Sequence, residues 1–558
     1  MREWTLSECW SPHPKRNRKR IAMNKNRLTY LLNLILPAVV FSAIAGALTA
    51  IIIFIFKMSS SYVISLSKKI YAFGQADMRF LPLILIGAAL AGLIVSIILK
   101  YSPDSRGGGI PTAIAALRGY VPFNKKRGLI TVFFSSMFTY LCGIPLGTEG
   151  PSVQMGALTG HIVSKTLGKK HPAWERYIMT GSTCAGFGVA TGSPMTGIFF
   201  AFEEAHRRFS PMIFMVAAMT VAFSTAVNEL LCSAFSVSSK LFHFGLVETL
   251  PIRSIWLAAL VGLVSGVLAL VFTKLYGFVK ELDKKAEKIP SALKIPIVFL
   301  LCAFVGFLSY DIIGTGHSII EELAEGKGIL NFLLICFCAR AILMITSNVL
   351  GITGGLFIPN LAFGAIIGAL CARLMIWCGV LGTEHIAIVV VIGMVSFLGA
   401  TSRIPISAIV FGVEALAGTK AVLAITVGVT IAFVVIEAMG IESFTDTVIH
   451  GKVEKYSHGR EIVTIDAYVT VTEGAFVIGK EIRDILWPPS CVIVSVNNAI
   501  SASRIGSGMA VGDILHIHCQ STHPSVTARD IEALVGKQNF DITKGSHSDN
   551  LTKQVPDA

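Results

Sequence analysis

The sequence predicts an all-α polytopic membrane protein with broken helices, followed by a small cytoplasmic α+β domain. Of its 558 residues, 53% are hydrophobic and 15% are charged, whereas a soluble domain carries about 25% charged residues. The mean hydropathy is +0.69. A large soluble protein with buried helices would need polar helix faces, which the apolar segments lack. Clear apolar segments of the kind that cross a bilayer are Leu31–Phe56, Leu81–Leu99, Met212–Cys232, Ile255–Phe272 and Ile295–Leu308.

The residues before the first apolar segment carry much of the net charge of +13. Residues 1–29 are predicted as a basic arm, which the positive-inside rule places in the cytoplasm. A nucleic-acid-binding arm is the other interpretation of such a run, but a membrane segment follows directly, so no nucleic-acid partner is expected. The first span is too long for a signal-peptide core, and Met23 is a second candidate for the start. The basic residues are Lys15, Arg16, Arg18, Lys19, Arg20, Lys25 and Arg27.

Residue types that carry enzyme or metal chemistry do not form recognisable patterns. Most of the 11 cysteines lie in apolar segments, and no set of His and Cys has the spacing of metal ligands. We expect nearly all of these cysteines to be packed thiols. Catalytic-triad spacing and phosphate-binding loops are also missing. The sequence therefore predicts no enzyme, no metal and no cofactor.

The chain divides into regions of different composition. Residues 30–452 hold the apolar segments and are predicted as the membrane domain. Residues 459–540 have the strand and turn patterns of a small α+β domain, and residues 541–558 form a polar tail. Several apolar segments of the membrane domain are interrupted by Gly and Pro, as in GTEGPSVQMGALTGHIV and GGLFIPNLAFGAIIGAL. Such breaks at membrane depth are tolerated only inside protein or along a watery cavity.

Glycine and proline positions recur at a nearly constant offset. Three ordered pairs at nearly the same spacing indicate two homologous halves, and interrupted segments in corresponding positions point to the binding site of a transporter. The pattern does not say whether the halves are parallel or inverted. The pairs are Gly147–Gly160 with Gly355–Gly368 (offset 208), Pro194 to Glu203 with Pro405 to Glu414 (offset 211), and Gly107-x-Gly109 with Gly314-x-Gly316 (offset 207).

Three breaks share one order of residues, in which Gly precedes Pro and an apolar helix follows. They are 107–111, 147–151 and 355–359. Pro suits the first helical turn, and Gly lets backbone approach a ligand closely. A helix N-terminus presents unpaired N–H groups and the positive end of the dipole, so it binds anions. Helix-packing glycines are the alternative, but three such starts in two repeats favour one dehydrated anion held near the middle of the membrane.

Glu149 lies at one of these helix starts. An acid at the bilayer centre costs at least ~2.5–3.5 kcal/mol on insertion scales, so a function is expected for it. In its anionic form this side chain is able to occupy the anion site itself, and once protonated it is free to swing away. Glu149 is therefore a candidate for both a gate and a proton carrier.

The three motifs together resemble those of the CLC family of chloride channels and proton-coupled chloride exchangers. The family has Gly-Ser-Gly-Ile-Pro, Gly-Lys/Arg-Glu-Gly-Pro and Gly-x-Phe-x-Pro motifs in this order, and here they stand as GGGIP, GTEGP and GLFIP. Over residues 30–452 the resemblance implies inverted repeats, a homodimer with one pore per subunit and a multi-pass protein of the cell membrane. It also implies an anion held by the backbone around Gly107, Gly108, Gly109, Ile110, Leu356, Phe357 and Ile358.

The resemblance also implies roles for two acids. Glu149 matches the external gating glutamate of the family, and Glu204 matches the internal proton glutamate that exchangers have and channels typically lack. Glu203 is expected to be structural. Without the resemblance, Glu203 and Glu204 would be interpreted as acids at a solvated helix end. The predicted function is a proton-coupled chloride antiporter, with chloride and protons as its partners. The alternatives are a passive voltage- or pH-gated anion channel on the same fold and a ligand sensor that transports nothing.

Three positions depart from the family pattern. Gly108 replaces the motif serine, so its hydroxyl contact with the anion is lost. Thr148 replaces the basic residue of the second motif, which weakens the positive charge near the outer site. Thr445 aligns with the inner tyrosine, so the resemblance places it among the anion-binding residues, but it is too short to close the pore as a phenol does. We therefore expect relaxed discrimination between chloride and other monovalent anions, and looser proton coupling.

The C-terminal unit resembles the RCK-C (TrkA-C) domain of prokaryotic ion transporters. The resemblance rests on the order AFVIGKEIRDI, VIVSVNN and VGDILHI, and it does not extend to the paired CBS domains of eukaryotic family members. Domains of this kind often pair and bind small regulators, nucleotides among them. A small-molecule or nucleotide regulator is one expectation for residues 459–540, and a plain dimerisation module is the other. Both termini are expected in the cytoplasm.

Overall fold

The computed structural model describes residues 25–121, 125–168, 171–244, 247–327, 330–457, 463–500 and 508–538. Two units are distinguished: residues 1–40, of which 25–40 are helical, and residues 41–558, which contain the features below. The polar tail and residues 1–24 of the predicted arm lie outside the described residues. The last residues of that arm, 25–29, belong to a helix.

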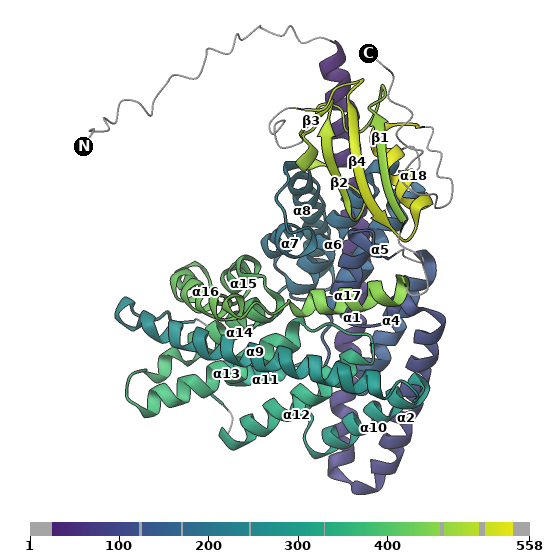
Figure 1. The fold of residues 1–558 in the computed structure, drawn as a ribbon. Coiled ribbons are helices and arrows are strands. Elements are labelled where there is room, and N and C mark those ends of the chain that lie inside the picture. Colours follow the sequence, from purple (N-terminus) through teal and green to yellow (C-terminus); the bar gives the residue numbers. More distant parts are fainter. Residues whose placement is uncertain are drawn as a thin grey trace, which may run out of the picture. The chain divides into compact units, whose positions relative to one another are not determined.

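The regular secondary structure of the described part of the membrane domain consists of helices (Figure 1). The first half contains α1 (Lys25–Ala76), α2 (Leu81–Tyr101), α3 (Ile110–Leu117), α4 (Lys125–Leu141), α5 (Glu149–Thr166), α6 (Glu175–Thr191), α7 (Pro194–Phe200) and α8 (Pro211–Ala234). The second half contains α9 (Ile255–Lys285), α10 (Ser291–Leu308), α11 (His317–Ala324), α12 (Leu330–Val349), α13 (Phe357–Trp377), α14 (Ile386–Ser402), α15 (Pro405–Phe411), α16 (Val422–Ala438) and α17 (Phe444–Ser457).

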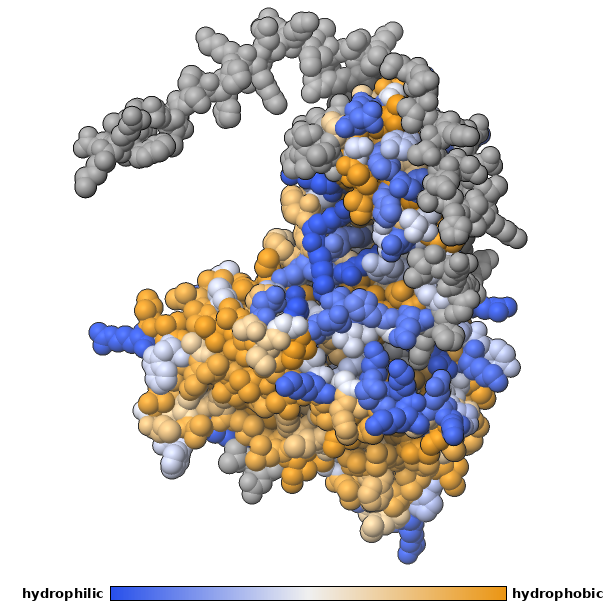
Figure 2. All heavy atoms as spheres, viewed as in Figure 1, coloured by the Kyte–Doolittle hydropathy of each residue, from blue (hydrophilic) through white to orange (hydrophobic). Residues whose placement is uncertain are grey.

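Nine helices of the described chain are long and apolar enough to cross a membrane. Their outward faces carry large exposed hydrophobic side chains, for example Leu83, Leu230 and Leu308, each about two-thirds exposed or more. Figure 2 shows such side chains covering the visible face of the helices, while polar residues gather where the C-terminal domain begins. This pattern suits a lipid environment, in which helices satisfy their own backbone groups. The predicted fold class is confirmed.

The two homologous halves meet through reciprocal backbone bonds. Gly147 N–H donates to Gly355 O and Gly355 N–H donates to Gly147 O, both at 2.7 Å, in an antiparallel bridge. Gly147 and Gly355 occupy corresponding positions in the two repeats. An approximate two-fold axis that exchanges the repeats therefore exchanges the two bonds. An inverted repeat requires such a relation. Two more bonds are equivalent in the same way: Gly107 N–H to Gly351 O (2.9 Å) and Gly314 N–H to Gly143 O (2.7 Å).

A second reciprocal contact joins two π-helical turns, Ala201–Ala205 and Gly412–Ala417. Each turn carries a glutamate whose carboxylate accepts bonds from backbone N–H groups at the start of the other half's short helix, α15 or α7. Because first-turn N–H groups have no partner within their helix, each carboxylate acts as a cap supplied by the opposite repeat. The donors are Ile406 (2.8 Å) and Ser407 (2.6 Å) to Glu203, and Met195 (2.8 Å) and Thr196 (2.9 Å) to Glu414.

Replacing Glu414 with Gln is expected to lower the thermal stability of the membrane domain. The neutral amide loses charge-assisted bonds to two N–H groups, a loss of about 1–2 kcal/mol. Thermal unfolding in detergent measures it. Glu437→Gln is the matched control, because that carboxylate is more than half exposed and faces Arg403 at 3.5 Å. Equal unfolding temperatures for the two variants would show that the cross-repeat caps do not stabilise the fold.

The C-terminal domain is a four-stranded antiparallel sheet with one helix. Its strands are β1 (Val463–Thr470), β2 (Cys491–Val496), β3 (Ala499–Ile500) and β4 (Ile514–Ser521), in the order β1-β4-β2-β3. The helix α18 (Pro524–Val535) follows β4. Alternate residues of the strands, such as Val469 and Ile517, join Ile531 in a fully buried core, as period-two strands require.

Two cysteines of this domain correct the expectation of packed thiols. Cys491 on β2 and Cys519 on β4 are bonded as a disulfide. The β2–β4 register makes these two residues direct partners, which brings their Cβ atoms within bonding range. Their separation of 28 residues did not indicate a pair, because strand register is a tertiary feature.

The C-terminal domain docks on the start of α6. Tyr177 Oη donates to Asp484 O at 2.8 Å and accepts from Leu486 N–H at 3.0 Å. Arg176 donates to Leu486 O and to Trp487 O, and Arg208 donates to Ile485 O. The turn at residues 484–487 therefore contacts the start of α6 and, through Arg208, the segment that follows the π-helical turn Ala201–Ala205. Figure 1 shows the sheet standing next to α6 and α8.

Candidate anion and proton site

Three helix N-termini meet at the glycine motifs, those of α3, α5 and α13. A Cβ atom on Gly109 would lie 2.1 Å from Gly150 O, and one on Gly150 would lie 2.1 Å from Gly108 O. A Cβ on Gly355 would lie 2.5 Å from Gly150 N. Only glycine permits these approaches. The motif glycines therefore bring three sets of unpaired N–H groups together, which is the arrangement that an anion requires.

A cavity lies beside these helix starts and collects most of the predicted site residues. Six of them line it: Gly108, Ile110, Leu356, Phe357, Glu204 and Thr445. The other lining residues are Pro111, Asn360, Leu398, Ser402, Ile404 and Phe444. The remaining predicted residues are not part of the lining: Gly107 and Gly109 flank Gly108, Ile358 follows Phe357 in α13, and Glu149 begins α5.

The Glu149 carboxylate is fully buried at the N-termini of α5 and α13. Its Oε1 accepts from Thr148 Oγ1 at 2.9 Å. Its Oε2 lies 2.7 Å from the position of a Cβ on Gly147 and has no hydrogen-bond partner among the described residues. The backbone N–H groups of Glu149 itself and of Ile358 electrostatically stabilise the negative charge of this carboxylate. The side chain is therefore where the helix starts would hold an anion.

A cation from a distant helix acts electrostatically on Glu149. Lys57 on α1 is largely buried, and its charge acts on Glu149. Its Nζ donates to Ser239 O at 3.0 Å, which anchors it on the loop after α8. The sequence analysis missed Lys57. The available signal was a charged residue inside an apolar helix segment of 40 residues, since such residues are costly and mark functional sites.

The Glu204 carboxylate lies at the other predicted proton position, in the first π-helical turn. It is 5% exposed, and Thr445 Oγ1 donates to its Oε1 at 2.9 Å. The hydroxyl that was predicted to contact the anion therefore bonds to the acid. Because π-helical turns are rare and frequently lie at functional sites, the turn itself supports a role for Glu204.

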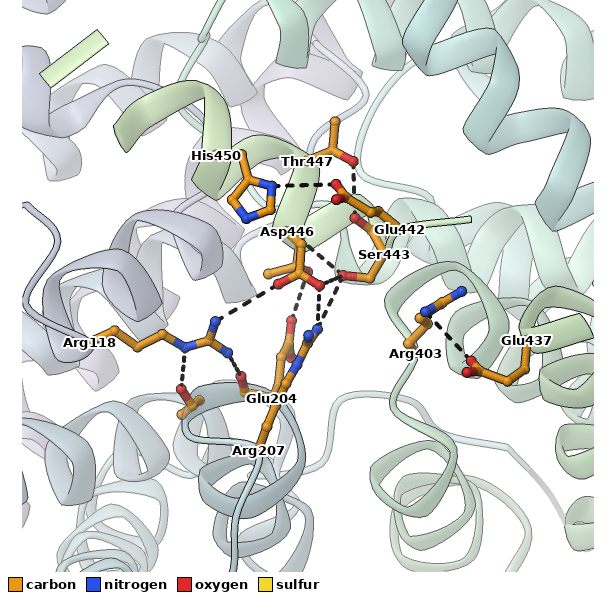
Figure 3. A network of polar contacts seen from close by, with 12 residues as sticks. Arg118, Glu204, Arg207, Arg403, Glu437, Glu442, Ser443, Asp446, Thr447 and His450 are labelled. Carbon is orange, nitrogen blue, oxygen red and sulfur yellow. Dashed lines mark hydrogen bonds and ion pairs between the residues drawn. The ribbon is translucent and has the colours of Figure 1, made fainter. Parts of the chain in front are cut away.

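A network of charged residues supports the backbone around Glu204 (Figure 3). Arg118 donates to Glu204 O and to Ala205 O, both at 2.9 Å. Asp446 accepts from Arg207 at 2.5 Å and lies 3.9 Å from Arg118. These contacts join the end of α3, the π-helical turn and α17, so the backbone that carries the carboxylate is held by three separate segments.

The sequence analysis also missed Asn360, which lies one turn into α13 and lines the cavity. Its Nδ2 donates to Thr401 Oγ1 at 3.4 Å, and its Oδ1 has no partner among the described residues. The available signal was an amide side chain directly after Pro359 in an otherwise apolar helix. Polar groups in such positions face a protein interior or a cavity.

The fold and the cavity define the class: a polytopic ion-transport protein built from two repeats with broken helices. Residues 87–437 match the family model described as "Voltage gated chloride channel". The chain belongs to this family. The resemblance of the motifs to those of CLC proteins is thereby confirmed, and membership agrees with the prediction that the protein is not an enzyme.

Two of the relatives that resemble this chain are named as H(+)/Cl(-) exchange transporters. The H(+)/Cl(-) exchange transporter ClcA of Yersinia pestis bv. Antiqua (strain Angola) is 26% identical over 408 residues, which is 72% of this chain and 84% of the relative. The ClcA of Salmonella agona (strain SL483) is 27% identical over 383 residues, or 67% and 80% of the two chains.

Among solved structures, a slow cyanobacterial Cl-/H+ antiporter has a TM-score of 0.69 at 20% identity, covering 75% of this chain and 98% of that one. A CLC-type fluoride/proton antiporter has a TM-score of 0.60 at 19% identity, covering 72% and 96%. At these identities the structures are evidence for the fold alone.

Proposed function

We propose that this protein is a proton-coupled chloride antiporter of the cell membrane, with both termini in the cytoplasm. The observation that carries the proposal is the placement of two buried carboxylates: Glu149 at the converging helix starts, and Glu204 in the wall of the cavity that adjoins them. Curated relatives named as H(+)/Cl(-) exchangers support the same activity.

Glu149 acts in this proposal as a gate that competes with the anion. Its carboxylate lies at the starts of α5 and α13, where chloride would bind, so chloride enters there only after the side chain leaves. Protonation removes the charge that holds the carboxylate at the helix dipoles. One proton is thereby taken up when an anion enters, and this exchange couples the two fluxes.

Glu204 supplies protons from the cytoplasmic side. It lines the cavity with Thr445, whereas Glu149 begins α5 and is not part of the lining. A buried acid at this position favours the exchanger over the passive channel, because an anion conduit needs no second carboxylate. The Thr445 hydroxyl keeps the Glu204 side chain turned toward the cavity.

Reconstituted flux with a simultaneous pH reading tests the proposal. Purified protein in liposomes is given an outward chloride gradient, with external chloride and pH recorded together. We expect chloride efflux to drive protons into the vesicles against a proton gradient. Chloride efflux without any proton movement would instead establish the passive channel.

We infer a regulatory role for the C-terminal domain. Its turn at residues 484–487 bonds to Arg176 and Arg208, and Arg208 lies four residues after Glu204, so movement of the domain reaches the proton site. The resemblance to RCK-C domains, a small-molecule or nucleotide regulator and the homodimer remain proposals. Burial, together with the neighbouring Glu481 carboxylate, raises the pKa of Asp484 in this contact.

A further inference from the structure

Asn348 lies beside the position of the missing motif serine. It is in the last turn of α12 and is 5% exposed. Its amide Nδ2 is 3.3 Å from the position that a Cβ on Gly108 would take. Gly108 lines the anion cavity. The Asn348 amide therefore stands where a side chain of residue 108 would project.

The orientation of this amide is fixed by a tyrosine. Tyr276 Oη donates to Asn348 Oδ1 at 3.3 Å, which leaves the two N–H groups of Nδ2 on the side of Gly108. The Tyr276 ring packs edge-on against Phe444, with centroids 4.5 Å apart, and Phe444 lines the cavity. Tyr276 and Asn348 are thus a hydrogen-bonded pair of side chains, and the amide of this pair lies beside Gly108 in the cavity wall.

Nδ2 of Asn348 has no hydrogen-bond acceptor among the described residues. A buried donor without an acceptor is costly, and such a group requires an explanation. The turn after α12 is stabilised by a backbone hydrogen bond, in which Gly351 N–H donates to Asn348 O at 2.9 Å. The side chain is therefore not needed to shape the loop.

We propose that Asn348 donates an Nδ2–H bond to the anion bound at the helix starts, in place of the serine that Gly108 lacks. The proposal rests on the assignment of this cavity as the chloride site. The helix starts of α3 and α13 favour a ligand that carries negative charge. The Asn348 amide lies beside Gly108 without being part of the cavity lining, and Gly354 O also lies 3.7 Å from the Cβ position of Gly108. Asn348 is then a determinant of chloride affinity, and Tyr276 is its positioning residue.

This assignment changes the expectation drawn from Gly108. The loss of the serine hydroxyl predicts relaxed discrimination between anions, because residue 108 itself supplies no side-chain donor. Asn348 replaces the donor from a position 240 residues further along the chain. We therefore expect chloride to keep an affinity that depends on a side chain as well as on backbone N–H groups.

Chloride binding to purified protein in detergent, measured by titration calorimetry, tests the proposal. Asn348→Leu keeps the size of the side chain and removes the donor, and its Kd for chloride is expected to rise about tenfold or more. Adding Gly108→Ser to this variant restores a donor at the same point and should recover most of the affinity. Asn228→Leu is the matched control, since Asn228 is an equally buried amide on α8 that is not among the nearest neighbours of Gly108.

Tyr276→Phe provides a second test, should Asn348→Leu fail to fold. It keeps the packing against Phe444 and frees the amide to rotate, so a several-fold rise in Kd is expected. Unchanged chloride affinity in a folded Asn348→Leu or Tyr276→Phe variant would overturn the role of Asn348 while leaving the antiporter intact. A wild-type protein that binds no chloride would overturn both.

Discussion

Glu149→Gln is expected to abolish proton transport while chloride flux continues. The amide has nearly the shape of a protonated carboxyl group, but it neither takes up nor releases a proton. It also carries no charge to hold it at the N-termini of α5 and α13, so the chloride position should stay accessible at every pH. Chloride efflux and external pH, recorded together on liposomes between pH 4 and pH 7, check both parts of this prediction.

The Thr148 hydroxyl provides the control for Glu149. Thr148→Val removes the 2.9 Å bond to Oε1 and leaves the carboxyl group in place, so proton transport should persist. Chloride-driven proton uptake at the wild-type rate in the Glu149→Gln variant would mean that another residue carries the proton. Chloride flux that kept its pH dependence in this variant would equally exclude Glu149 as the gate.

Glu204→Gln is expected to stop proton movement and to leave chloride flux near the wild-type rate. Its carboxylate is the buried acid of the cavity wall, so proton delivery to the interior ends with its loss. The glutamine amide still accepts from Thr445 Oγ1, which keeps α17 in place. The same liposome assay measures the ratio of protons to chloride ions.

The adjacent acid gives a matched control for Glu204. Glu203 points instead to the start of α15, where two backbone N–H groups bind its carboxylate. Glu203→Gln should therefore lower stability and retain proton transport. Proton transport that survived in Glu204→Gln and failed in Glu203→Gln would reverse the assignment of the two acids.

Residues distant in the sequence lie near the positions that depart from the family motifs. Thr148 lacks the usual positive charge, and Lys57 on α1 places an ammonium group within electrostatic range of Glu149. Gly108 lacks a hydroxyl, and the amide of Asn348 lies beside it. Thr445 lacks a phenol and bonds to Glu204 instead.

The sequence by itself determined the fold class, the broken helices and the helix starts that line the cavity. These features are local: an apolar segment of sufficient length spans a bilayer, and Gly followed by Pro begins a helix. The constant offset between the repeats determined that two halves exist. Glu149 and Glu204 stood out because carboxylates in an apolar chain are costly.

Only the tertiary structure decided how these local elements meet. The reciprocal bonds of Gly147 with Gly355 establish the two-fold relation, which no offset along a chain distinguishes from a parallel one. The partners Lys57 and Asn348, and the Cys491–Cys519 disulfide, depend on helix packing and strand register. Local periodicity records which face of an element is apolar, but contacts between distant segments are set by the packing of whole elements, so they leave no local pattern to read.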